Sequence, residues 1–286
     1  MRVHSSTRRA VLFSGLAAGL LHAAPALSSG DAGRKINVAG RQQMLGQRIA
    51  MAVMMARANV DGRDYIAIMK EAFGAFEAAQ VGLRAGDPAL GLSAEGDPRV
   101  LVALDAVEEI WPSYAEAVVS VALKGEVDKP TSVQIALLNG DVLERTEAVV
   151  QNVLSAYGPG RGAAIAIGIA GRQRMLTQKM VKEAALLYLG MRRPENRNAI
   201  RGTLTLFDDG LNGLLHGDSA LELPAPPDSV RERLERANAI WIEASATVRD
   251  VADQGFADEY DLQVLSNYRD PLLEAFEEVV TLYEVA

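Results

Sequence analysis

The sequence predicts an all-α protein made of two tandem antiparallel four-helix bundles, and an internal repeat is the main reason. Residues 36–50 read INVAGRQQMLGQRIA and residues 167–181 read IGIAGRQRMLTQKMV, an offset of 131 positions. Seven of the nine residues from Ala39 to Gln47 recur in the second copy, which indicates a duplication. No stretch shows the alternating, β-branched pattern of a strand.

The duplication covers whole domains. Residues 76–92 align with 207–223 at the same offset, and IWPSYAEAV from Ile110 aligns with IWIEASATV from Ile240 after a shift of one residue. A chain of 286 residues is long enough for two domains of common size. We predict domains over 31–157 and 163–286, separated by the helix-stopping residues Gly-Pro-Gly-Arg-Gly.

Eight helices are expected from runs of strong helix formers with apolar residues at helical spacing. Asp61-Gly62, the Gly- and Pro-containing segment 85–98 and the three prolines of 223–228 separate neighbouring runs, and Pro112 is expected to be tolerated or to bend its helix. Four such helices joined by turns bury their apolar stripes on one another. The expected ranges are 35–59, 64–84, 99–124, 131–157, 163–190, 194–216, 229–253 and 258–284.

Residues 1–26 are predicted to be a cleavable signal peptide. Arg8 and Arg9 precede an apolar run over 10–21 and a small-residue site at 24–26. The string STRRAVL resembles a twin-arginine (Tat) export signal, with general secretion and an uncleaved anchor as the alternatives. No later segment approaches twenty uninterrupted apolar residues, so we expect a soluble periplasmic protein.

Composition disfavours several classes of function. Without Arg2, Arg8 and Arg9 the chain keeps 26 of its 29 basic residues against 37 acidic ones, a net charge of −11 that disfavours nucleic acid as a partner. The absence of cysteine excludes disulfides, thiolate metal sites, covalent c-type haem and cysteine nucleophiles.

Residue types that would support catalysis or a cofactor are scarce. The only histidine beyond the leader is His216, expected to cap a helix or lie on the surface. No Glu-x-x-His pair is present for a di-metal centre, and Met44, Met51, Met54 and Met55 are interpreted as core rather than as haem ligands. We therefore expect no enzyme activity, no metal and no cofactor.

The repeated helix carries arginine and glutamine on faces that are otherwise small or apolar. Two neighbours are expected for it, its own bundle and the partner copy. Donors that point into a helix seam must be satisfied, either by a small planar oxyanion or by carboxylates that only fix the packing. Spacing alone leaves both interpretations open.

The strings AGRQQMLGQR and AGRQRMLTQK resemble the N-terminal helix motif of the PilJ-type domain family of pilus chemotaxis transducers, related to the periplasmic sensor domain of NarX-type nitrate/nitrite kinases. In the nitrate sensors, an arginine from each of two protomers grips one nitrate. The resemblance places Arg174 at that position, whereas the first copy has Gln43 instead. A second arginine of the motif matches Arg48, and the second copy departs from it with Lys179.

The resemblance implies that the tandem halves form, within one chain, a pairing that sensor kinases make between chains. The expected function is non-catalytic sensing of a small oxyanion similar to nitrate or nitrite, reported to a membrane-bound receptor, kinase or transporter. The alternative is a structural or interaction module of an envelope complex. Implied ligand-binding residues are Arg174, Gln43, Arg48, Lys179, Gln47 and Gln178, and motif residues with a structural role are Arg41, Arg172, Gly40, Gly171, Met44 and Met175.

Overall fold

The computed structural model describes residues 29–60, 63–158 and 162–285, so the predicted signal peptide lies outside the described residues. This part of the chain forms α-helices and loops with one short 3-10 turn, η1, and no strand. The helices are α1 (Ser29–Ala58), α2 (Tyr65–Ala85), α3 (Pro98–Lys124), α4 (Lys129–Tyr157), α5 (Gly162–Tyr188), α6 (Arg193–His216), α7 (Asp228–Gln254) and α8 (Glu259–Val285), with η1 over Ser219–Leu221.

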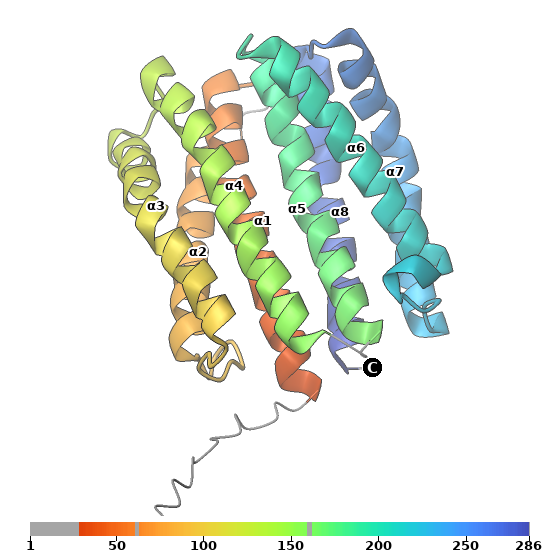
Figure 1. The fold of residues 1–286 in the computed structure, drawn as a ribbon. Helices are drawn as coiled ribbons and strands as arrows, with labels where there is room; N and C mark the ends of the chain where they lie inside the picture. The colour runs from red at the N-terminus through yellow and green to blue at the C-terminus, as the bar shows by residue number, and fades with distance from the viewer. Residues whose placement is uncertain (1–28, 61–62, 159–161, 286) are drawn as a thin grey trace, which may run out of the picture.

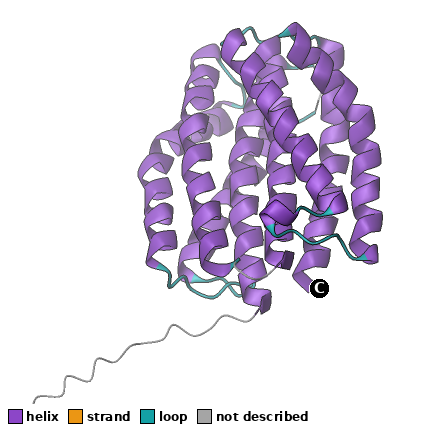
Figure 2. Cartoon of the chain, turned by 45° about the vertical axis from the view of Figure 1, so that its right-hand side comes forward, coloured by secondary structure: helices purple, strands orange, loops and turns teal. Residues whose placement is uncertain are grey.

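The helices form two four-helix bundles that lie side by side (Figure 1). In the first bundle each of α1 to α4 packs on the helices before and after it, and α4 closes the bundle against α1; helices α5 to α8 repeat this arrangement. Helices α1 and α5 lie at the centre of the molecule and form the most extensive contact between the halves, with α8 and α4 completing it (Figure 1). Figure 2 shows the described chain as helices joined by loops. The all-α, two-bundle prediction is confirmed.

Helix ends follow from short polar residues and glycines. The side chains of Asp64, Asp97 and Asp128 each accept a backbone N–H at the start of a helix, and Gly125 and Gly255 adopt the left-handed conformation that terminates one. The predicted ranges agree with these ends to within two residues, except that α1 begins six residues earlier than expected.

A repeated loop follows α2 and α6, and the sequence reading did not predict its internal pairing. Asp87 pairs with Leu92 in an isolated antiparallel bridge, and Asp218 pairs with Leu223 in the same way. Gly86 and Gly217 precede these bridges, each at a φ of +81°. A Cβ added to Gly86 would lie 2.7 Å from Ala94 N, and one added to Gly217 would lie 2.9 Å from Ala225 N. Glycine is therefore required at both positions, and the duplication preserves the loop.

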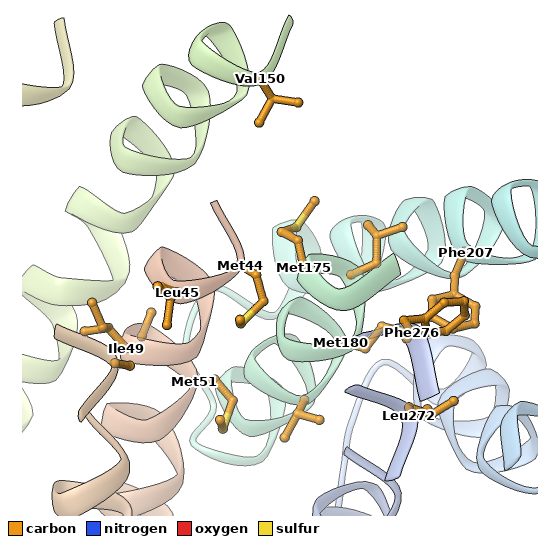
Figure 3. Close-up of a cluster of buried hydrophobic side chains, with 14 of the residues drawn as sticks. Met44, Leu45, Ile49, Met51, Val150, Met175, Met180, Phe207, Leu272 and Phe276 are labelled. Atoms are coloured by element: carbon orange, nitrogen blue, oxygen red, sulfur yellow. The ribbon is translucent and has the colours of Figure 1, made fainter. Parts of the chain in front are cut away.

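Each bundle has an aromatic cluster at the place where the repeat puts a tryptophan. Trp111 stacks on Phe76 with ring centroids 3.9 Å apart, and Trp241 packs on Phe207 at 4.1 Å. Phe276 meets Phe207 edge-on at 5.7 Å. Figure 3 shows part of the core, with the last two rings together in the second bundle and methionines on α1 and α5. The interpretation of the methionines as core is confirmed, since Met44, Met51, Met54, Met55, Met175 and Met180 are all buried.

Candidate functional site

The contact between α1 and α5, called the seam here, brings the two copies of the motif together. Gly40 and Gly171 lie opposite each other. A Cβ built on Gly40 would be only 3.7 Å from the Gly171 Cα. Residues later in α1 meet residues later in α5, so the two helices run in the same direction. Small residues at the crossing allow this close approach of two backbones.

Arg174 lies fully buried at this crossing, and its guanidinium already has partners within the chain. Nη1 donates to Glu277 Oε2 of α8 at 2.6 Å, and Nη2 donates to Asn37 Oδ1 of α1 at 2.8 Å. Nε has no partner within the described part of the chain. Burial lowers the pKa of Arg174, and the charge of Glu277 opposes that shift.

Gln43, the counterpart of Arg174, is also buried, but its side chain is directed to α4 of its own bundle. Its Nε2 donates to Glu147 Oε2 of α4. Glu147 and Glu277 occupy corresponding places in the last helices of the two halves, in the strings TEAVV and FEEVV. Each copy thus joins its motif residue to a glutamate, by an ion pair in the second copy and by an amide hydrogen bond in the first.

The second predicted basic position is held by carboxylates as well. Arg48 Nη1 lies 3.4 Å from Asp270 Oδ1 of α8. Lys179 Nζ donates to Glu183 of its own helix and to Thr203 Oγ1 of α6. Arg48 therefore contacts the neighbouring half, whereas Lys179 remains inside its own bundle.

The two predicted glutamines are both buried, with different surroundings. Gln47 Oε1 accepts a hydrogen bond from Lys182 Nζ at 2.7 Å, and the same ammonium donates to Asn139 Oδ1 at 2.8 Å. Burial lowers the pKa of Lys182 to about 8, with Glu183 opposing and Lys179 adding to the shift. Gln178 is buried and neither of its amide atoms has a partner within residues 29–60, 63–158 and 162–285.

Sequence reasoning missed Lys182, although a signal was present. The residue at the same place in the first copy is the buried Met51, so a lysine at this position marks a buried charge. The remaining motif residues divide by exposure, with Gly40, Gly171, Met44 and Met175 buried and Arg41 and Arg172 exposed. His216 is exposed in the last turn of α6.

A cavity of about 260 Å³ opens beside the seam between α1, α4 and α5. Its polar lining comes from Gln43, Glu147, Gln151 and Arg172, so the motif contributes to it from both copies. Arg174 does not line it. The apolar lining comes from Ile36, Val150, Leu154, Ile165, Ile169 and Leu221.

Two further features bear on function. In the described residues no group of three or more histidine, aspartate or glutamate side chains is arranged to hold a metal ion. Within the same ranges, none of the helices combines the length and hydropathy that a membrane crossing requires.

Comparison with known families agrees with the duplicated geometry. Residues 27–136 and 160–266 both match the PilJ family model, described as the N-terminal region of type IV pili methyl-accepting chemotaxis transducers. The chain belongs to the PilJ family. Each matched segment includes one motif helix, and Glu147 and Glu277 lie beyond the matched residues. No curated protein and no solved structure matches the chain.

Membership of the PilJ family identifies a sensory, signal-transduction module, and the recognition made from the two motif strings is confirmed. The family comprises sensory transducer domains rather than a known class of enzymes. The tandem arrangement places two copies of this module in one chain, joined through the helices that carry the motif.

Proposed function

We propose that this PilJ protein is a non-catalytic ligand-binding sensory protein of the periplasm that reports to a membrane-associated receptor, kinase or transporter. The observation that supports it is the seam, where the motif helices of two sensory modules pack on each other within one chain. In this proposal the protein switches between two states by a shift of α1 against α5. We retain 31–157 and 163–286 as the proposed extents of the two domains, and a Tat-type leader as the proposed export signal.

For the ligand, the proposal retains a small oxyanion similar to nitrate or nitrite at Arg174. Arg174 is a buried cation with one free donor, Nε, and its partner Glu277 keeps 40% of its side chain exposed. A planar oxyanion that replaces this carboxylate would accept the charge-assisted hydrogen bond that Nη1 now donates to Glu277. Because Glu277 belongs to α8, its release would loosen α8 from the seam and so change the packing of the second bundle.

A thermal-shift titration with nitrate, nitrite and chloride tests this ligand class. We expect Glu277→Gln to unfold at a lower temperature than the wild type, because a buried guanidinium loses its counter-ion. Nitrate should restore the lost stability by binding the folded state, and chloride should restore less. Gln43→Ala serves as a control that leaves Arg174 and Glu277 in place.

The alternative function is a structural or interaction module without a small ligand. What favours it is that Arg174, Gln43 and Arg48 all have carboxylate partners within the chain. Its signature is that none of the anions changes the melting temperature of the wild type or of Glu277→Gln, and that Arg174→Gln still captures the membrane partner. Nitrate-specific rescue of Glu277→Gln contradicts it.

A further inference from the structure

The two sides of the seam differ in charge at the position of the repeated glutamate. On the α8 side, Glu277 is neutralised by Arg174. On the α4 side, Gln43 takes the place of that arginine, and Glu147 forms no ion pair with any described residue. The duplication thus leaves one copy of the glutamate without the cation that the other copy has.

The carboxylate of Glu147 is held in place by neutral donors. Gln43 Nε2 donates to Oε2, and Gln151 Nε2 donates to Oε1 at 2.8 Å. Both donors are neutral amides, so neither supplies a positive charge to the carboxylate, which lines the cavity. An organic cation at this point would form the charge-assisted hydrogen bond that Arg174 forms in the second copy.

The cavity also exists because of substitutions between the copies. The residues that correspond to Gly168, Ile165 and Leu154 in the other half are Asn37, Arg34 and Glu284, and these three form a polar network there. Asn37 also accepts a hydrogen bond from Arg174. On the α4 side a glycine and two aliphatic side chains replace this network, and they leave a volume with apolar walls.

Size and lining limit the class of ligand. About 260 Å³ lies slightly below the range of about 300–1,000 Å³ that is typical for drug-sized ligands. Six aliphatic side chains line it, and Glu147 lies among its few polar residues. Arg172 also lines the cavity, but its side chain is exposed, where water weakens its repulsion of a bound cation.

We propose that this cavity binds a small organic ammonium ion with an apolar body, its ammonium group donating to Glu147 and its hydrocarbon chain lying against Val150, Leu154 and Ile165. This inference rests on the proposed ligand-binding function and adds a second ligand class at a site separate from Arg174. Bound at the junction of α1, α4 and α5, such a ligand contacts both halves of the chain.

Isothermal titration calorimetry of the full chain with hexylammonium tests the proposal, with hexanoate and hexanol as probes of the same length. Hexylammonium should bind, hexanol should bind more weakly, and hexanoate should not bind. Glu147→Gln should weaken hexylammonium binding by about tenfold or more, because a charge-assisted hydrogen bond becomes a neutral one. Gln43→Arg should abolish it, because this substitution supplies the cation that the second copy already has.

Glu277→Gln is the matched control, since it alters the corresponding carboxylate in the other half and should leave hexylammonium binding unchanged. Circular dichroism of each variant shows whether it is folded. Absence of hexylammonium binding to the wild type, or equal binding by wild type, Glu147→Gln and Gln43→Arg, overturns the cavity proposal. If nitrate still rescues Glu277→Gln in that case, the proposed sensory function stands without this site; if nitrate also has no effect, both fail.

Discussion

Replacement of Lys182 by methionine, the residue at the same place in the first copy, gives the most quantitative test of the seam. Lys182 is buried, and its ammonium donates to Gln47 and Asn139 rather than to a carboxylate. Burial lowers its pKa from 10.5 to about 8. At a value of about 1.4 kcal/mol for each pH unit of difference, this depression corresponds to about 3 kcal/mol of lost stability at neutral pH.

The sign of the pH dependence follows from the same values. Between pH 8 and pH 10.5 the unfolded chain keeps the Lys182 proton while the folded chain has released it, so stability rises with pH in this window. Other groups titrate there too, and their contribution cancels when the wild type is compared with Lys182→Met. The lost hydrogen bonds to Gln47 and Asn139 change this difference by a constant that does not depend on pH.

Urea denaturation of both proteins at a series of pH values from 7 to 10.5 measures this difference. The free energy of unfolding of the wild type should rise relative to that of Lys182→Met by about 3 kcal/mol over the series. A difference that stays constant across the series would show that Lys182 keeps an ordinary pKa, and would refute the burial of its ammonium in the seam.

Two further predictions concern packing. Glu95→Ala should cost about 3–5 kcal/mol in urea denaturation, because Lys35 Nζ lies 3.1 Å from Glu95 Oε2 and both side chains are buried; a cost below about 1 kcal/mol would contradict this. Gly40→Val should lower the melting temperature, because its branched side chain enters the crossing with Gly171, whereas Gly202→Ala, with open space around its Cβ, should stabilise by up to about 1 kcal/mol. Equal melting temperatures for these two variants would argue against close contact of α1 and α5.

Helix existence could be predicted well because helix formers, short caps and glycine stops are local properties. Segment 129–157, for example, begins after Asp128 and ends before Gly158, as its residues indicate. Pro112 lies within α3, in agreement with the expectation that the helix tolerates it. The bridges in the loops after α2 and α6 were not predictable from strand patterns, because each is a single residue pair.

The candidate site was predictable only in part. The motif placed Arg174 and Gln43 on helices that meet, but the direction of each side chain depends on Glu277 and Glu147, which lie about a hundred residues further along the chain. No local pattern encodes such a distant partner. Alignment of the two copies does pair these glutamates, and it shows that only the second faces an arginine. Comparison within the duplicated sequence was thus the available signal for the uncompensated carboxylate.

Pairing of the two motif helices within one chain is the claim on which the other conclusions depend. The chain has no cysteine, so Arg41→Cys/Arg172→Cys can be spin-labelled at only these two exposed positions, next to Gly40 and Gly171. Double electron–electron resonance is then measured with and without a large excess of unlabelled wild-type chain. A short distance between the labels that persists unchanged on dilution is expected. Loss of that distance on dilution would show that the motif helices meet between chains, and would contradict the account.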